Sequence, residues 1–255
     1  MIKIKTKGEI EKMIRGGKML ADVLTEAMNF IKPGVSEKDL DNLAERLILE
    51  KGGEPGFKRV SGYKNTICIS TNDVVVHGIP TDYKFKEGDL VGVDCGVYYQ
   101  GFNTDMSETI EVKSQKSKVK NEKVDKFLRI GKEALEKGIE QARAGNRVGN
   151  ISKIIQEIVE IKGGFGIVRS LVGHGVGKDL HEEPEIPGFL DRPINRTPLL
   201  REGMTIAIEI IYNMGNSDVM LAKDGWTIKT RDGSLSGLFE KTVVVTADRP
   251  LILTK

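Results

Sequence analysis

The segment LVGHGVGKDLHEEP, residues 171–184, contains two of the three histidines of the chain. His174 and His181 are seven positions apart and would share one face of a regular helix, but the alternate glycines of residues 173–177 disfavour a helix here. Glycine at alternate positions instead lets a backbone approach another group closely. Alone, the segment is as compatible with a turn that carries incidental histidines as with a site at which imidazole binds a ligand.

Two apolar stretches each contain one acid at the same place in a common pattern. EGDLVGVDCG and EGMTIAIEII both continue from Glu-Gly into an extended apolar run, with Asp94 and Glu209 six residues after the glycine. Because side chains alternate faces along a strand, each acid shares its face mainly with small residues, while branched apolar residues take the other face. Such a carboxylate is costly unless it is paired or binds a metal ion.

Two more acids lie in comparable settings. Asp105 follows the Asp94 strand after a turn, and Glu240 lies in the β-branched run LFEKTVVVT. Each acid alone is also compatible with an ordinary surface carboxylate at a strand end. Carboxylates that converge repel one another, and protons or cations relieve that repulsion. Together with His174, the four acids balance the charge of two divalent cations, which predicts a two-metal site with hard oxygen donors.

The elements that would position these residues occur twice. A helical pattern over residues 34–53 matches one over residues 145–164, with the apolar spacing of an amphipathic helix in both copies. A further helix with the motif Arg-x-Gly-Lys precedes each of them, at 15–18 and 129–132. The chain therefore has the order helix, helix and strands twice.

The repeats predict a single catalytic domain, residues 1–255, made of two related halves of about 1–112 and 123–255. Two repeats are too few for a solenoid, so we expect the halves to pack about a pseudo-two-fold axis and to share one sheet. The lysine-rich segment 113–123 is predicted to be a solvated linker, because scattered lysines without aromatic residues are a poor indication of nucleic-acid binding. A site between the halves would take equivalent residues from each.

Composition restricts the class of protein. Hydrophobic residues make up 39% and charged residues 30% of the chain, as in ordinary globular proteins, and the net charge of +2 favours neither nucleic acid nor membrane as a partner. We find no apolar run near the roughly 20 residues that span a bilayer, and the N-terminus lacks the apolar core of a signal peptide. Cys68 and Cys95 do not form a CxxC motif, so we expect reduced thiols in a cytoplasmic protein.

Several segments together resemble methionine aminopeptidases. They are VVHGIP (75–80), DCGVYYQGFNTD (94–105), GHGVGKDLHEEP (173–184), the IEI around Glu209 and FEKTVVVT (239–246). The resemblance runs along nearly the whole chain and points to the type I form, because the short stretch between His181 and Glu209 leaves no room for the large insertion of the type II form. It implies the pita-bread fold, a duplicated α+β structure with a central, mainly antiparallel sheet covered by helices.

The resemblance implies a hydrolase that removes the initiator methionine from nascent proteins when the second residue is small. It also implies a set of metal ligands, which are Asp94, Asp105, His174, Glu209 and Glu240. Asp105 and Glu240 would bridge two divalent ions, of Co, Mn, Fe or Zn, and a water or hydroxide between the ions would attack the peptide carbonyl. Asp94 would complete one ion, and His174 with Glu209 the other. Glu209 is also the candidate proton shuttle.

The resemblance assigns the remaining histidines to catalysis and an aromatic cluster to substrate binding. His181 would hydrogen-bond the substrate backbone or the developing oxyanion, and His77 would face the site from the other half. Tyr63, Cys68 and Trp226 match positions of the apolar methionine pocket. Without the resemblance, His77 would fit an ordinary strand-end histidine, and Trp226 a core aromatic.

This sequence departs from the family pattern at four positions. Ile210 stands where proline is usual, Leu238 where glutamine is usual, and Lys241 where histidine is usual. Leu180 stands where an aromatic residue lines the pocket. By strand alternation, Ile210 and Lys241 should point away from the metals. Leu238 should lie on the metal-facing side and Leu180 near the substrate, so these departures should affect the rate and the side-chain preference rather than the metal site.

Three functions fit these patterns. The first is removal of the initiator methionine, the second is an aminopeptidase of the same fold with a shifted first-residue preference, and the third is a binding protein that has lost catalysis. The presence of all the ligands and all three histidines argues against the third. We expect a monomer that acts on the N-terminal methionine of nascent polypeptides, and a transient contact with the ribosome is compatible with this function. Neither a membrane nor a specific nucleic acid is expected as a partner.

Overall fold

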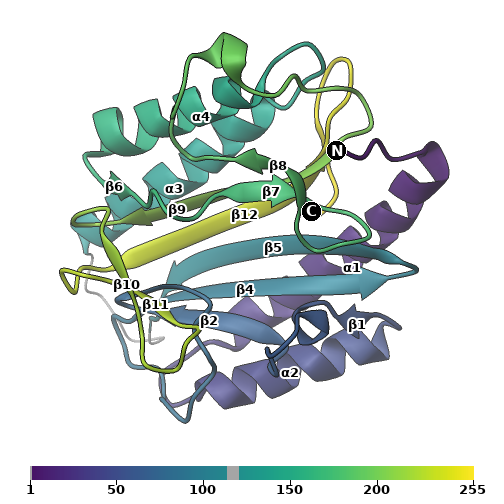
Figure 1. Cartoon of the computed structure of the whole chain (residues 1–255). Helices are drawn as coiled ribbons and strands as arrows, with labels where there is room; N and C mark the ends of the chain where they lie inside the picture. The colour runs from purple at the N-terminus through teal and green to yellow at the C-terminus, as the bar shows by residue number, and fades with distance from the viewer. Residues whose placement is uncertain (1, 114–120) are drawn as a thin grey trace.

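A computed structural model describes residues 2–113 and 121–255 of the chain (Figure 1). The predicted linker, 113–123, therefore lies mostly outside the described residues, and its last two residues belong to a helix. Figure 1 shows a central sheet with one pair of helices packed on the strands of the first half and a second pair on the strands of the second half. Each half thus carries its own helical cover.

The helix pairs occur where the repeated pattern predicts them. They are α1 (Lys7–Phe30) and α2 (Glu37–Glu50) in the first half, and α3 (Glu122–Glu140) and α4 (Val148–Gln156) in the second. Thr6 and Ser36 begin α1 and α2 with capping boxes, in which each side chain accepts a hydrogen bond from the backbone three residues further on. The α-helix predicted over 145–164 ends early, at Gln156, and continues as π-helical turns, η2, over Glu157–Gly163.

The strands of the described residues form one large antiparallel sheet and one small sheet. Those of the first half are β1 (Glu54–Pro55), β2 (Ile67–Thr71), β3 (Val74–Val76), β4 (Leu90–Tyr99) and β5 (Phe102–Glu111). Those of the second half are β6 (Gly166–Ile167), β7 (Gly173–Gly175), β8 (Glu182–Ile186), β9 (Thr205–Asn213), β10 (Val219–Leu221), β11 (Ile228–Thr230), β12 (Ser236–Val244) and β13 (Leu251–Ile252). Two 3-10 turns are η1 (Phe57–Arg59) and η3 (Ile194–Arg196). The large sheet has the order β1-β4-β5-β12-β9-β7-β8, with β2 beside β4, β6 beside β9 and β13 beside β12; the small sheet has the order β10-β11-β3.

Two apolar cores lie between the large sheet and its helices. The core of the first half joins α1 and α2 to β4 through residues such as Val93, and the core of the second half joins α3 and α4 to β9 through residues such as Ile208. Because side chains alternate along a strand, Asp94 and Glu209 lie on the opposite face of the sheet. This alternation is the one that the sequence predicts.

The two halves meet where β5 pairs with β12 in the middle of the sheet. Ser107 of β5 pairs with Glu240 of β12, and each of them pairs on its outer side with an acid of its own half, Asp94 or Glu209. The α+β class and the central antiparallel sheet covered by helices agree with the predicted fold.

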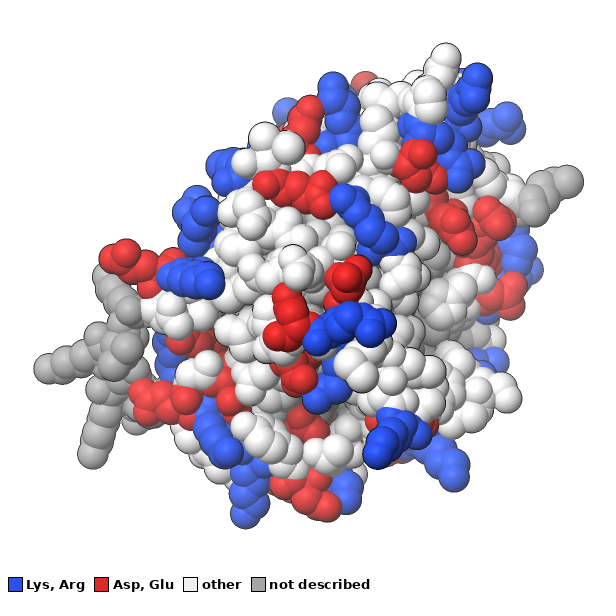
Figure 2. All heavy atoms as spheres, turned by 60° about the vertical axis from the view of Figure 1, so that its left-hand side comes forward, with Lys and Arg blue, Asp and Glu red and all other residues white. Residues whose placement is uncertain are grey.

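The face drawn in Figure 2 carries charged side chains of both signs. Acidic and basic side chains are interspersed over that face, in keeping with the net charge of +2. Among the described residues, no helix is long and apolar enough to cross a membrane.

Candidate metal centre and substrate cavity

Strand register brings three of the four predicted acids into a single line across the sheet. We call this line the acid row, which consists of Cys68, Asp94, Ser107, Glu240 and Glu209 on β2, β4, β5, β12 and β9. Its members are direct neighbours on adjacent strands, so their side chains leave the sheet side by side. The two outer acids belong to different halves and meet the central strands from opposite sides.

A second line runs beside the acid row on the same face and contains the fourth acid. We call it the histidine row, which consists of Gly96, Asp105, Thr242, Ala207 and His174. Because Ala207 and Thr242 are small, the imidazole of His174 reaches towards Asp105, with 3.9 Å between Nε2 and Oδ2. The same Nε2 lies 3.8 Å from Oε1 of Glu209.

Threonine hydroxyls hold the two central strands at the seam. The backbone ladder between β5 and β12 is two residue pairs long and includes Ser107–Glu240. Beyond it, Oγ1 of Thr242 accepts a hydrogen bond from the backbone N–H of Asp105 at 2.9 Å and donates one to the Asp105 carbonyl at 2.8 Å. The side chain of Thr242 therefore replaces a backbone pairing and fixes Asp105 against β12.

The same contact recurs on the other side of the acid row. Oγ1 of Thr109 accepts from the backbone N–H of Leu238 at 2.9 Å and donates to its carbonyl at 2.7 Å. This contact belongs to a third line on the same face, the leucine row, which consists of Ser70, Gly92, Thr109, Leu238 and Ile211. The two threonines are related by the pseudo-two-fold axis that passes through the seam.

The four acids lie close together, with Asp105 and Glu240 buried and Asp94 and Glu209 largely buried, which makes their ionisation costly. Burial raises the pKa of Asp105 to about 7 and that of Glu209 to about 8. Burial, and then the negative charges of neighbouring acids, raise the pKa of Asp94 and of Glu240 well above the usual carboxyl range. A bound cation would relieve this repulsion and let all four carboxylates ionise.

Two observations show that these residues fit a metal ion. Oδ1 of Asp94 and Oε1 of Glu240 are buried without a hydrogen-bond partner among the described residues, although such oxygens are normally satisfied. Asp105, His174 and Glu240 each offer one donor atom, and these atoms all lie within 4.8 Å of one another. Oxygen and imidazole nitrogen together are donors that divalent transition metals accept.

His174 is held in the form that a ligand requires. Burial lowers its pKa to about 4, so the imidazole is neutral near pH 7. The backbone carbonyl of Gly175 accepts a hydrogen bond from Nδ1 at 2.8 Å, which leaves the lone pair of Nε2 directed at the acids. His174 lies in strand β7 rather than in a turn, and a Cβ on Gly173 would lie 2.5 Å from the Ala207 carbonyl. The glycines thus permit close strand packing.

One cavity of about 200 Å³ contains all the predicted ligands and both remaining histidines. His181 lies at its exposed rim, and its ring is 4.4 Å from that of His174 between centroids. His77 follows β3 with a φ of +56°, a strained backbone conformation for a non-glycine residue and one that is frequent at functional sites. Burial lowers the pKa of both His77 and His181.

Residues 11–247 match the model of metallopeptidase family M24. This chain belongs to metallopeptidase family M24. It is 42% identical over 254 residues to a methionine aminopeptidase of Clostridium perfringens, covering 100% of this chain and 99% of that protein. It is 40% identical over 255 residues to methionine aminopeptidase 1 of Bacillus subtilis, covering 100% of both.

Solved structures give the same result for this M24 peptidase. The methionine aminopeptidase of Thermotoga maritima superposes with a TM-score of 0.94 at 42% identity over 100% of both chains. The prolidase of Pyrococcus furiosus superposes with a TM-score of 0.78 at 27% identity, over 99% of this chain and 65% of that one. The fold is the pita-bread fold that the sequence predicts.

The predicted pocket residues form one wall of the cavity of this M24 peptidase. We call Tyr63, Cys68, Leu180 and Trp226 the apolar wall. The rings of Tyr63 and Trp226 pack edge to face at 5.2 Å between centroids, and Leu180 packs against the same cluster. The hydroxyl of Tyr63 donates to the Ile67 carbonyl at 2.8 Å, so its ring is fixed.

Sequence reasoning missed several other residues of the cavity. They are Phe57, Val60, Val76, Leu171, Val172 and Ile211. Ile211 lies two residues after Glu209, so strand alternation could have placed it on the same face. Phe57 lies in the turn η1 and packs edge to face on Tyr63 at 6.4 Å, and no local pattern marks that position.

The departures from the family pattern lie as strand alternation predicts. Ile210 points into the core beneath α3 and α4, and the Nζ of Lys241 donates to the Thr254 carbonyl at 2.8 Å, away from the acids. Leu238 is 2% exposed and packs in an apolar cluster with Ile211. At a position where the family resemblance implies glutamine, Leu238 therefore extends the apolar side of the site.

Proposed function

We propose that this M24 peptidase removes the N-terminal methionine from polypeptides whose second residue is small, using two divalent metal ions. The observation that carries the proposal is that the proposed metal ligands and the apolar wall line one cavity. A hydrolytic centre would then lie against a pocket suited to an unbranched thioether. The match to a metallopeptidase family supports the metal dependence.

Asp105 and Glu240, which lie on the two central strands, would hold both ions. Asp94 would complete the ion on the side of the first half, and Glu209 with His174 the ion on the side of the second half. Ions of Co, Mn, Fe or Zn suit this mixture of oxygen and nitrogen donors. When bound, they would polarise the scissile carbonyl and provide a water of lowered pKa as the nucleophile near neutral pH.

We assign the remaining roles from the family resemblance and from position around the cavity. Glu209 is the proposed proton shuttle to the leaving amine, since it borders both the ligand cluster and the cavity. His181 would donate a hydrogen bond to the developing oxyanion, and His77 would contact the substrate backbone from the opposite half. Because their pKa values are lowered, both rings are neutral near pH 7 and each keeps one N–H donor.

We further propose that the enzyme is a cytoplasmic monomer that acts on nascent chains. Cys68 and Cys95 are both free and buried, which suits a reducing compartment. A transient contact with the ribosome would bring the cavity to the emerging N-terminus. Co-sedimentation with ribosomes that carry a nascent chain tests that contact, and light scattering tests the oligomeric state.

The function is tested by peptide cleavage after removal of metal and reconstitution with Co²⁺ or Mn²⁺. We expect Met-Ala-Ser to be cleaved, Leu-Ala-Ser to be cleaved more slowly, and Ala-Pro-Ser to resist. Chelation should abolish cleavage, and metal should restore it. Equal cleavage of Met-Ala-Ser and Ala-Pro-Ser would contradict the methionine assignment and favour a broader aminopeptidase. Metal binding without cleavage of any peptide would favour a binding protein.

A further inference from the structure

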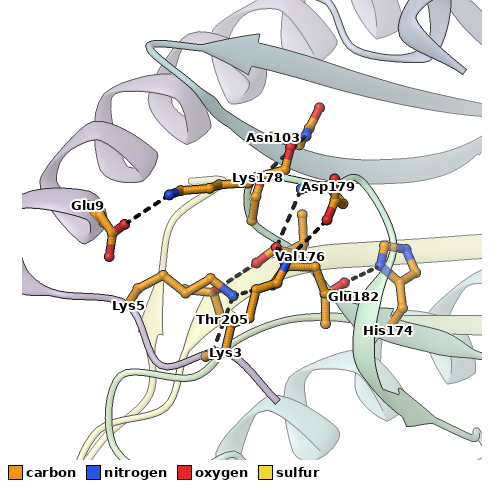
Figure 3. Close-up of polar contacts among 12 residues, drawn as sticks. Lys3, Lys5, Glu9, Asn103, His174, Val176, Lys178, Asp179, Glu182 and Thr205 are labelled. Carbon is orange, nitrogen blue, oxygen red and sulfur yellow. Dashed lines mark hydrogen bonds and ion pairs between the residues drawn. The ribbon is translucent and has the colours of Figure 1, made fainter. Parts of the chain in front are cut away.

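The segment that precedes α1 reaches the strand that follows His181 (Figure 3). The Nζ of Lys5 lies 2.7 Å from Oε2 of Glu182, and these side chains are only 5% and 2% exposed. Figure 3 shows Lys3 and Lys5 extending from the N-terminal segment towards the start of β8. A buried ion pair therefore joins residues that are 177 positions apart in the chain.

Further contacts hold both members of this pair in place. Glu182 also accepts from the Nζ of Lys3 at 3.2 Å and from the backbone N–H of Asp179 at 3.4 Å. The backbone N–H of Lys5 donates to the Gly203 carbonyl at 2.9 Å, just before β9. The carboxylate of Glu182 therefore binds the N-terminal segment and also stabilises the turn that precedes β8.

The turn between β7 and β8 is also held from the first half. The backbone N–H of Asn103, at the start of β5, donates to the Gly177 carbonyl at 2.7 Å, and its side-chain amide donates to the Lys178 carbonyl at 3.0 Å. A Cβ on Gly177 would lie 2.6 Å from Cε of Lys5, so the lysine packs directly on the turn. Residues 177–182 are therefore fixed between the N-terminal segment and β5.

We propose that the Lys5–Glu182 pair is a positioning device that fixes the turn so that His181 faces the reacting carbonyl. His181 is the residue directly before Glu182, and its ring lies at the rim of the cavity beside His174. Burying two charges costs more desolvation than a hydrophobic pair would, so stability alone does not account for the pair. Placement of His181 does account for the pair, because a catalytic group misplaced by about 1 Å loses much of its effect.

The inference rests on the proposed function, and it is tested by comparing Lys5→Met with Lys3→Met. Lys3 contacts the same carboxylate but is half-exposed, so its loss should change the rate by less than about twofold. Lys5→Met should lower kcat on Met-Ala-Ser roughly tenfold or more, with KM and metal content unchanged. An unchanged kcat, or a loss of bound metal, would overturn the assignment.

A second comparison separates positioning from a general loss of stability. In a His181→Ala background, Lys5→Met should lower kcat by less than about twofold, because the group that it positions is already gone. If Lys5→Met lowered kcat in the His181→Ala background by the same factor as in the wild type, the inference would be contradicted. The double change Lys5→Met with Glu182→Gln removes the buried charge altogether and should recover thermal stability without recovering kcat. Recovery of both would show a purely structural role.

The imidazole NMR spectrum gives a readout that needs no activity. The chain has three histidines, so the ring signal of each is assignable by substitution. Lys5→Met should shift or broaden the signal of His181 in the protein loaded with diamagnetic Zn²⁺ and leave that of His77 unchanged. An unperturbed His181 signal would overturn the proposal. If the wild-type enzyme cleaves no methionyl peptide, the proposed function fails instead, and this spectrum still tests the positioning.

Discussion

The histidine row and the leucine row lie on opposite sides of the acid row. The pseudo-two-fold relation between the two halves makes them equivalent. Both contain a threonine whose hydroxyl bonds to the backbone of the facing strand, Thr242 in one and Thr109 in the other. The facing residue is Asp105 in the histidine row and Leu238 in the leucine row. Where the histidine row ends on His174, the leucine row ends on Ser70. The framework is symmetric, but the side chains are not.

The difference shows how a duplicated sheet supports a one-sided site. The outer acids of the acid row, Asp94 and Glu209, keep the symmetry, whereas Ser107 and Glu240 at the seam break it. One side of the acid row therefore gathers proposed metal ligands, and the other side gathers apolar residues such as Leu238, whose cluster borders the cavity. A metal centre and a pocket for an apolar side chain can then lie next to each other.

The largest effect should come from Glu240, and the equivalent seam position, Ser107, provides the control. Glu240→Gln removes a proposed bridging carboxylate and should lower kcat/KM by roughly 10³-fold or more, since a metal ion contributes several kcal/mol to the transition state. Ser107→Ala at the equivalent position should keep both metals. Metal content by mass spectrometry of the native protein measures this. Two equivalents of metal bound by Glu240→Gln with unchanged affinity would remove that residue from the ligand set.

Substitutions of the two neighbouring histidines should have different effects, one on metal binding and the other on the rate. His174→Ala should lose metal, because the ring is a proposed ligand. His181→Ala should keep its metal and lower kcat by about 10²-fold to 10³-fold, the scale of one transition-state hydrogen bond. Metal titration and steady-state kinetics on the same samples distinguish these cases. Weak metal binding by His181→Ala would make it a ligand, and full activity would remove it from catalysis.

The two seam threonines offer a matched comparison of smaller size. Thr242→Val and Thr109→Val each leave a buried N–H and carbonyl unpaired and should each destabilise the fold by about 1–3 kcal/mol. Only Thr242→Val should also weaken metal binding, because Thr242 holds Asp105 whereas Thr109 holds Leu238. Urea denaturation and metal titration check the pair. Equal loss of metal affinity in both variants would mean that metal binding depends on the packing of β5 against β12 in general and not on the contact between Thr242 and Asp105.

The smallest effect concerns the apolar wall. Leu180 is smaller than an aromatic residue, so the slot should tolerate some leucine substrate. A misfit of one methylene changes discrimination by only about 1–3 kcal/mol. Leu180→Phe should therefore raise the ratio of kcat/KM for Met-Ala-Ser over Leu-Ala-Ser several-fold. An unchanged ratio would show that residue 180 does not set the width of the pocket.

Much of the face that carries the site could be predicted from local patterns. The alternation around Asp94 and Glu209 is strong, because their neighbours are branched apolar residues in regular strands, and the repeats indicated one shared sheet. The register that places Ser107 against Glu240 could not be predicted, because a long-range strand pairing leaves no local signal. The roles of the ligands came from the family resemblance rather than from spacing.

Other parts of the site were beyond sequence reasoning for different reasons. His174 lies in a three-residue strand, which is too short and too rich in glycine to show a period. Phe57 reaches the cavity from a single 3-10 turn. Lys5 and Glu182 are charged residues in segments that look exposed, and only the packing of the N-terminal segment on the turn buries them.

Anomalous diffraction from crystals of the Mn²⁺-loaded protein tests the one-sided metal centre most directly. We predict two peaks in the cavity, both in contact with Asp105 and Glu240. One should also contact Asp94, and the other His174 and Glu209. The leucine row, around Leu238, should carry no peak. A single peak, a peak beside Leu238, or two peaks that leave Glu240 without a metal contact would contradict the account.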